Sequence, residues 1–160
     1  MGQFIVLDLE WNQPLNPDSP LAIKLCTTLP FEIIQIGAVK LETGEQFKAT
    51  CCLQQYKILS PRISKLTGIT RQDVKHGETF QQAMDRFFRF CGEDPILLTW
   101  GFNDIPILRQ NLQFYGLDTS VTDRSYNLQI MFNQQHDPGN LVRGLSYAVD
   151  FFQLSVEESY

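Results

Sequence analysis

Two acidic residues interrupt an apolar stretch near the start of the chain. Residues 4–12 read FIVLDLEWN, so that only Leu9 separates Asp8 from Glu10. Alternate residues of a strand point to the same face, and the two carboxylates would therefore lie side by side. Carboxylates this close repel each other when both are ionised. A divalent cation would offset that repulsion, and carboxylate oxygens are ligands that suit Mg²⁺ or Mn²⁺.

A third acid, Asp104, follows the apolar residues 95–101, which read PILLTWG. Open α/β sheets bind their ligands at the ends of strands. Three acids from two strand ends could converge on two metal ions ~3.5–4 Å apart, which is an arrangement suited to phosphodiester hydrolysis. In the alternative interpretation, the acids only cap a strand end and face solvent or an arginine.

The strands that would position these acids are visible as short runs rich in Phe, Ile, Val and Leu. The predicted strands are residues 4–9, 31–41, 47–53 and 95–101. The sequence TGEQ predicts a turn within residues 31–53, which would then form a hairpin. Residues 95–101 are apolar throughout, and this is typical of a strand inside a sheet.

Helices are expected between and after these strands. Their predicted ranges are residues 59–70, 79–92, 104–115 and 141–152. Gly68 and Gly92 mark ends of the first two, and Thr79 is the expected N-cap of the second. Residues 125–132 suit either a strand or a helix. Four prolines predict a long loop over residues 12–30. The pattern indicates an α/β fold.

Composition predicts one domain over residues 1–160. The formal net charge of −5 does not exclude nucleic acid as a partner, but it argues against binding through a broad basic surface. Cys26, Cys51, Cys52 and Cys91 lack the spacing of a metal site, and we expect reduced thiols. Neither a signal peptide nor a membrane-spanning run is visible, so we expect a cytoplasmic protein without a membrane partner.

The ordered set of segments resembles the DnaQ-like 3′–5′ exonuclease family, in its DEDDh branch. Within that branch, the chain is most similar to the sporulation-inhibitor-type and ERI-type exonucleases. The segments that carry the resemblance are FIVLDLEW, EIIQIGAVKL, ISKLTGIT, TWGFNDIPIL, DRSYNLQIMF and GLSYAVDFF. The resemblance implies an RNase H-like fold, with a mixed five-stranded sheet flanked by helices.

The resemblance also implies a role for each acid. Asp8 would bridge two divalent metal ions, Mg²⁺ or Mn²⁺. Glu10 would hold the ion that activates water, and Asp104 would support the second ion, directly or through water.

Contacts to the substrate follow from the same resemblance. The backbone around Leu9 and the side chain of Trp11 would flank the terminal nucleotide. Leu66 and Thr67 would line the pocket of the last base, where aromatic and apolar faces can stack without sequence preference. Trp11 and Leu66 could equally be half-buried core residues.

The family's third motif, His-x-x-x-x-Asp, does not match any segment of this chain. The fifth residue after His76 is Gln81, and the fifth after His136 is Leu141. Asp150 has Leu145 five positions before it. We therefore expect both histidines to be surface residues, His76 in a turn and His136 in a loop. The chain as given is expected to lack its C-terminal motif III helix, and with it the general base and the fourth metal ligand.

The expected function is a metal-dependent 3′–5′ exonuclease. It would hydrolyse phosphodiesters at the 3′ end of single-stranded DNA or RNA to nucleoside 5′-monophosphates, with activity impaired in the chain as given. Two alternatives remain open: a catalytically inactive nucleic-acid-binding module, and a phosphohydrolase of small nucleotides or oligonucleotides. Self-association is a further expectation, through the surface that a final helix would cover.

Overall fold

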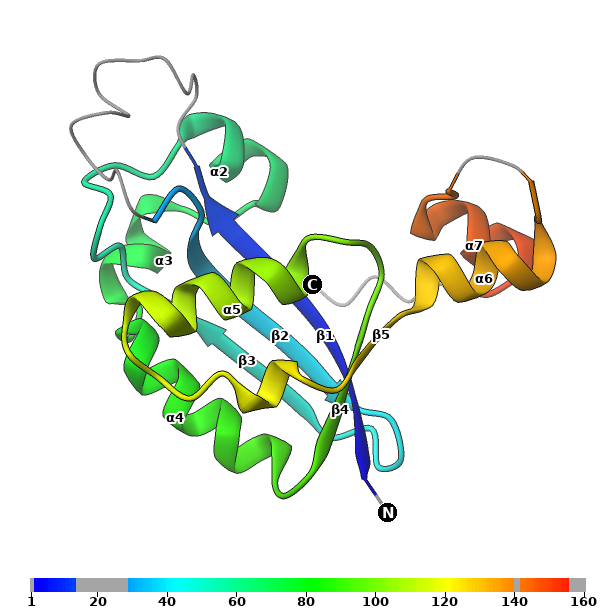
Figure 1. Ribbon diagram of the computed structural model, residues 1–160. Coiled ribbons are helices and arrows are strands. Elements are labelled where there is room, and N and C mark those ends of the chain that lie inside the picture. Colours follow the sequence, from blue (N-terminus) through cyan, green and yellow to red (C-terminus); the bar gives the residue numbers. More distant parts are fainter. Residues whose placement is uncertain (1, 14–28, 140–141, 156–160) are drawn as a thin grey trace.

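The computed structural model describes residues 2–13, 29–139 and 142–155. These residues form a five-stranded sheet in the order β3-β2-β1-β4-β5, flanked by helices (Figure 1). The strands β1 and β2, and likewise β2 and β3, run antiparallel, whereas β4 is parallel to both β1 and β5. The predicted α/β class and mixed five-stranded sheet are confirmed, and the strand that carries Asp8 and Glu10 lies at the centre of the sheet.

All four predicted strands are present, with adjusted ends. The strands are β1 (Gln3–Asn12), β2 (Glu32–Lys40), β3 (Gln46–Thr50), β4 (Pro95–Thr99) and β5 (Ser125–Asn127). The predicted hairpin is the antiparallel pair of β2 and β3. The third strand is shorter than predicted. It ends at Thr50, and although the Cys51 N–H still donates to the Ile34 carbonyl of β2, Cys51 also forms an isolated bridge with Glu78.

Helices surround the sheet. They are α2 (Pro61–Thr67), α3 (Arg71–His76), α4 (Phe80–Cys91), α5 (Asp104–Phe114), α6 (Leu128–His136) and α7 (Leu145–Phe151), with a 3₁₀ turn η1 (Ser120–Thr122). The predicted signals at two helix ends are confirmed. Gly68 ends α2 with φ 75°, in the left-handed region that glycine adopts without strain, and Thr79 begins α4 with a capping box to Gln82.

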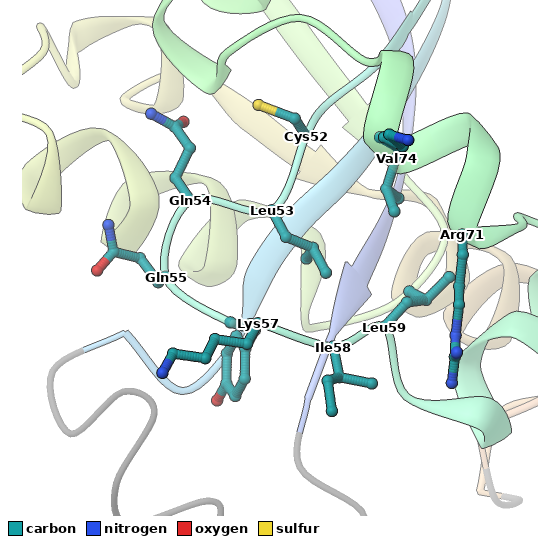
Figure 2. Close-up of a pocket in the computed structure, with 11 residues that line it drawn as sticks. Cys52, Leu53, Gln54, Gln55, Lys57, Ile58, Leu59, Arg71 and Val74 are labelled. Atoms are coloured by element: carbon teal, nitrogen blue, oxygen red, sulfur yellow. The ribbon is translucent and has the colours of Figure 1, made fainter.

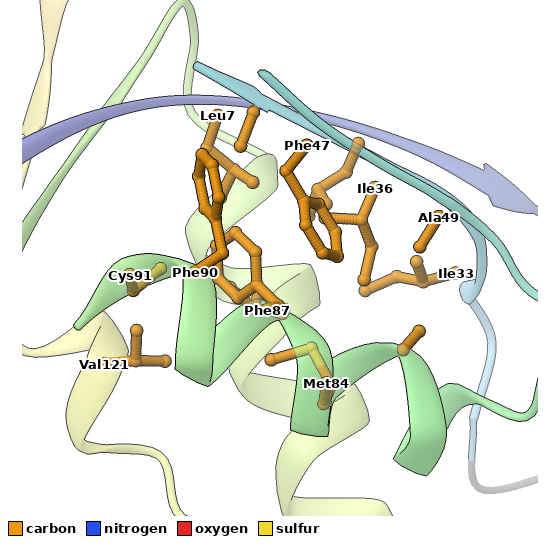
Figure 3. Packing of buried hydrophobic residues seen from close by; sticks show 14 of the residues in the cluster. Leu7, Ile33, Ile36, Phe47, Ala49, Met84, Phe87, Phe90, Cys91 and Val121 are labelled. Atoms are coloured by element: carbon orange, nitrogen blue, oxygen red, sulfur yellow. The ribbon is translucent and has the colours of Figure 1, made fainter. Parts of the chain in front are cut away.

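One face of the sheet packs on α4 and α5. Leu7, Ile36 and Phe47 of the sheet meet Met84, Phe87 and Phe90 of α4, as Figure 3 shows. A second, smaller cluster joins α2 and α3 to Ile34 of β2, through Leu59, Ile63, Ile69 and Val74. The main core therefore fixes the sheet, and the second cluster fixes α2 and α3 onto it.

Several predicted boundaries were wrong. Residues 125–132 are both a strand and a helix, since the Asn127 side chain accepts the N–H groups of Gln129 and Ile130 and so begins α6 directly after β5. The helix α3 was not predicted; its capping box is made by Thr70 and Asp73. His76 therefore ends α3 rather than lying in a turn, and His136 ends α6 rather than lying in a loop.

Some predictions fall on residues that the structure does not describe. Most of the loop predicted over residues 12–30 lies there, as does Cys26. The helix predicted over residues 141–152 is shorter than predicted, because residues 142–144 are described and are not helical, and α7 begins at Leu145. Cys51, Cys52 and Cys91 are free thiols, as expected. None of the helices in the described residues has the length and apolar character to cross a lipid bilayer.

Candidate metal centre

The central strand presents its two acids away from the main core. Leu7 and Leu9 are buried in that core, whereas Asp8 is exposed and Glu10 is half-buried. This alternation follows the two-residue period of a strand. Asp8 lies opposite Gly37 of β2, and Glu10 lies opposite Gln35, before a register shift at Trp11. Both carboxylates therefore leave the sheet on the same face.

Asp104 meets this strand from the first residue of α5. Its side chain is buried, and Oδ1 accepts the backbone N–H of Leu9 over 3.1 Å. An acid in the first turn also lies at the positive end of the helix dipole. Leu9 stands between Asp8 and Glu10, so this bond brings the third carboxylate to the strand segment that carries the other two.

The electrostatics of the three acids reflect this proximity. Burial raises the pKa of Asp104, and the charge of Asp8 raises it further, while the Leu9 N–H opposes the change. The pKa of Glu10 is raised by burial and then by the charges of Asp8 and Asp104. Partial desolvation also raises the pKa of Asp8, although Asp8 is an exposed residue. Repulsion between ionised carboxylates is therefore built into the site.

Cations in the described part of the chain do not pair with these acids. Within residues 2–13, 29–139 and 142–155, each ion pair joins other residues, and none includes Asp8, Glu10 or Asp104. The alternative in which an arginine neutralises these acids is therefore wrong for the described part of the chain. The alternative in which they face solvent still describes Asp8.

The carboxylate oxygens of the three acids are ligands that suit a hard divalent cation, and such a cation would offset the repulsion between them. In the described residues, however, no group of three or more His, Cys, Asp or Glu side chains is arranged to hold a metal ion. The three acids are neighbours without forming a ready coordination shell, and the predicted pair of metal ions stays a prediction.

The residues expected to contact substrate differ in their surroundings. The Leu9 side chain is buried, so only its backbone borders the acids. Trp11 is half-buried and packs edge-on against Phe31, with 6.5 Å between ring centroids, beside the main core. The packing of Trp11 is therefore that of a half-buried residue at the edge of the core, and its contact with substrate stays a prediction.

Leu66 and Thr67 lie at the end of α2. Leu66 is 76% exposed, so the interpretation of Leu66 as a half-buried core residue is wrong. The Thr67 hydroxyl donates to the Ile63 carbonyl and accepts the Ile69 N–H, which closes the last turn of the helix before Gly68. Thr67 thereby holds the segment that presents Leu66 to solvent.

His76 and His136 are exposed, as expected, and Asp150 is exposed as well. All three lie on elements other than β1 and α5, which carry the three acids. His76 precedes Gly77, whose backbone lies against Thr50 and Cys51 at the β3 edge of the sheet, two strands from β1. His136 packs on Phe132, Phe151 and Phe152 between α6 and α7. Figure 1 shows both helices to one side of the sheet, and Asp150 belongs to α7.

Two buried polar residues near the acids were missed by the sequence analysis. Asn12, which ends β1, donates to the Ile58 carbonyl and accepts the Ser60 N–H. Glu32, which begins β2, accepts the N–H groups of residues 54, 55 and 56 at 2.6, 2.9 and 2.9 Å. A polar residue at the end of an apolar strand was the available signal. Together they fix the connection from β3 to α2 beside the end of β1.

Comparison with known proteins identifies the family of this chain. The RNase T family model, described as an exonuclease, matches residues 5–132. Over 86 residues, the chain is 30% identical to the PolC-type DNA polymerase III of Clostridium perfringens (strain 13 / Type A); these residues are 53% of this chain and 6% of that protein.

Solved structures share the fold at low sequence identity. A 3′-exonuclease that recognises the 3′ end of the histone mRNA stem-loop matches with a TM-score of 0.77 and 18% identity, over 98% of this chain and 56% of its own. Cell-death related nuclease 4 matches with a TM-score of 0.71 and 15% identity, over 97% of this chain and 56% of its own. Product-bound exonuclease I matches with a TM-score of 0.69 and 15% identity, over 99% of this chain and 40% of its own.

The chain thus spans about half the length of the first of these structures and a small fraction of the polymerase. The family model covers most of the chain, including the segment of β1 with Asp8 and Glu10 and the helix that begins at Asp104. The chain belongs to the RNase T family of DnaQ-like exonucleases, with an RNase H-like fold.

Proposed function

We propose that this chain is the nuclease domain of a metal-dependent 3′–5′ exonuclease that acts on single-stranded DNA or RNA. The observation that carries the proposal is the bond from the Leu9 N–H to Asp104, which gathers three carboxylates without a cationic partner in the described residues. Membership of an exonuclease family makes phosphodiester hydrolysis the chemistry that this cluster would serve.

Each acid has a role in the proposal. Asp8 would bridge two ions, Glu10 would hold the ion nearest the attacking water, and Asp104 would hold the other. Bound Mg²⁺ or Mn²⁺ would supply Lewis-acid charge and lower the pKa of water. The backbone of Leu9, the exposed Leu66 and the edge of Trp11 would border the terminal nucleotide.

Hydrolysis needs two further groups. Asp8, Glu10 and Asp104 do not include a general base, and the family pattern requires a fourth carboxylate. His76, His136 and Asp150 lie on α3, α6 and α7 rather than on the elements that carry the three acids. We propose that none of these three supplies the missing groups, and that the 160-residue chain alone is impaired in turnover.

The test is hydrolysis of a 5′-labelled single strand in Mn²⁺, by the 160-residue chain and by the longest natural form of the protein. For the longest natural form we expect stepwise shortening from the 3′ end with release of nucleoside 5′-monophosphates, and no cleavage of a circular strand. The 160-residue chain should hydrolyse the strand much more slowly. Asp8→Asn should abolish turnover, whereas Asp150→Asn, on α7, should not.

The outcomes separate the alternative functions. Cleavage of a dinucleotide but not of longer strands would support a small-molecule phosphohydrolase. Binding of single strands without turnover by any natural form would support an inactive binding module. Cleavage within the circular strand would overturn the exonuclease proposal.

Self-association and a cytoplasmic location stay predictions. The side chains relevant to self-association are exposed apolar residues of α6, α7 and the segment after it: Met131, Leu145, Tyr147, Phe151, Phe152 and Leu154. A mass of two chains in light scattering, reduced by Phe151→Ser, would support self-association. A monomer at every concentration would contradict it.

A further inference from the structure

The positive side chains of this protein fall into two groups. Outside residues 46–77, all six described cations pair with an acid: Lys40 with Glu45, Arg86 with Glu78, Arg89 with Asp85, Arg109 with Asp123, Arg124 with Asp94, and Arg143 with Asp137. Within residues 46–77, the six cations are all exposed, and none forms an ion pair with a described residue. They are Lys48, Lys57, Arg62, Lys65, Arg71 and Lys75.

The charge of this segment is opposite to that of the chain. Residues 46–77 hold six cations and one acid, Asp73, which gives +5, while the whole chain carries −5. Asp73 accepts the N–H and hydroxyl of Thr70 as part of a helix cap. The net charge argued against binding through a broad basic surface, but it does not reveal this local basic segment.

Three of these cations line one groove. Lys57, Arg71 and Lys75 border a groove of about 610 Å³ between α3 and the connection from β3 to α2. Its other described lining residues are uncharged, and they include Ile58, which is 52% exposed. Figure 2 shows the labelled Lys57 on the connection and Arg71 descending from α3 beside Ile58 and Leu59. A groove whose described lining holds three cations and no acid, and whose cations pair with no described acid, suits a polyanion.

The connection that borders the groove is bonded to the end of the strand that carries Asp8 and Glu10. Asn12, two residues beyond Glu10, bonds to the backbone of Ile58 and Ser60. Ser60 directly precedes α2, which presents Leu66 to solvent. A chain bound at the acids could therefore continue past the end of β1 and α2 into the groove.

The walls of the groove are fixed before any ligand binds. Glu32 holds the N–H groups of residues 54–56, on one wall. On the other side, a Cβ on Gly77 would lie 2.7 Å from Cys51 C and Cys52 N, so the end of α3 lies directly on the backbone after β3. Such preorganisation lowers the entropic cost of binding.

The geometry points to this groove as a track for the phosphodiester backbone of the substrate, on the 5′ side of the nucleotide held at the acids. The inference rests on the proposed function and names the part of that substrate which binds outside the metal centre. Lys57, Arg71 and Lys75 would each neutralise a phosphate, without reading sequence, and would release condensed counterions. The exposed Ile58 would pack against a base between them.

The test is equilibrium binding of fluorescent single strands in EDTA, so that turnover is absent. The variant is the triple substitution Lys57→Gln, Arg71→Gln, Lys75→Gln. A strand of about 20 nucleotides exceeds the ~4–16 that a single OB-fold domain covers and is long enough to reach the groove, while one of about two nucleotides would reach only the acids. We expect the longer strand to bind at least about tenfold more weakly, and the slope of log affinity against log salt to fall by about 2, at ~0.7 for each phosphate contact.

A matched control removes the same number of charges elsewhere. Arg89→Gln, Arg109→Gln, Arg124→Gln also makes the chain three units more negative, but each of these arginines already pairs with an acid. We expect its affinity and salt slope to stay within about twofold of the wild-type values, since these arginines lie outside the groove and the charge of each is offset by its acid. Equal losses in both triple variants would mean that net charge alone governs binding, and would overturn the inference.

Two further results separate this inference from the proposed function. The groove variant of the active natural form should hydrolyse a dinucleotide at the wild-type rate and longer strands more slowly. Absence of hydrolysis in every form, with strand binding still lost in the groove variant, would refute the enzyme and leave the track standing. Wild-type protein that does not bind the longer strand, or a groove variant that binds it unchanged, would refute the track.

Discussion

The backbone N–H of Leu9 donates to Asp104 Oδ1 over 3.1 Å and joins residues that are 95 positions apart in the chain. The bond attaches the first residue of α5 to the middle of the central strand. It also holds the Asp104 carboxylate close to Asp8 and Glu10: burial and then the charges of Asp8 and Asp104 raise the pKa of Glu10, and the charge of Asp8 adds to the effect of burial on the pKa of Asp104. One hydrogen bond therefore links the packing of a helix to the electrostatics of the candidate metal centre.

We expect Asp104→Asn to change how the stability of the metal-free protein depends on pH. The amide oxygen still accepts the Leu9 N–H, but the charge is gone. Because folding raises the pKa of Asp104, the folded state binds more protons than the unfolded state as pH rises above the ordinary value of 3.8. Asp104 therefore lowers the free energy of unfolding as pH rises from its ordinary pKa to its raised pKa in the folded state. Asp104→Asn should remove this loss of stability.

The measurement is urea denaturation in EDTA from pH 3.5 to pH 7, compared between Asp104→Asn and the wild type. The variant should gain stability relative to the wild type with rising pH and keep the gain at neutrality. Asp85→Asn is the control, because Asp85 pairs only with Arg89 on an exposed helix face. A variant whose relative stability falls with pH would contradict the raised pKa.

Glu32→Ala should destabilise the fold and loosen the groove. The buried carboxylate accepts three backbone N–H groups, and alanine leaves them without that acceptor. Donors that lose a buried partner typically cost ~1–3 kcal/mol each, and since this connection can reach water, we expect a loss of about 2–4 kcal/mol in total. Chemical denaturation measures the loss. Glu93→Ala, at an exposed position, should stay within about 0.5 kcal/mol of the wild type.

Leu66→Ala and Trp11→Ala should differ in their effect on the stability of the fold. Leu66 is exposed, so its truncation should change stability by less than about 0.5 kcal/mol while weakening single-strand binding without base preference. Trp11 packs against Phe31 and the main core, and its truncation should cost roughly 1–3 kcal/mol, less than for a fully buried tryptophan. Thermal melting separates the two variants, whereas single-strand binding should weaken in both, because both side chains would border the terminal nucleotide. A Trp11→Ala variant with unchanged melting would contradict the packing role.

Local signals in the sequence predicted most of the framework. The helix α4 follows from Thr79, its apolar face and Gly92, because capping and periodicity act within a few residues. The helix α3 was missed, since six residues with one buried side chain give almost no periodicity. The prediction for residues 125–132 was ambiguous because Asn127 both ends β5 and caps α6, so that a strand and a helix share this short segment.

The candidate site was predictable to the extent that it lies on regular elements. Asp8, Glu10 and Asp104 were identifiable from strand alternation and from strand ends. Their connection through the Leu9 N–H was not, because a contact across 95 positions depends on how α5 packs on the sheet. The groove was also not predictable, since its cations are distinguished by lacking ion-pair partners, and pairing is a property of the folded surface.

The most direct test of the central claim, that Asp8, Glu10 and Asp104 together bind a divalent cation, is a Mn²⁺ titration followed by electron paramagnetic resonance. We predict one weak Mn²⁺ site in the wild-type 160-residue chain, because three carboxylates carry too little charge to hold two ions tightly. Binding should be lost in Glu10→Gln and retained in Asp150→Asn. Equal Mn²⁺ binding by Glu10→Gln and the wild type, or no binding by the wild type at millimolar Mn²⁺, would contradict the claim.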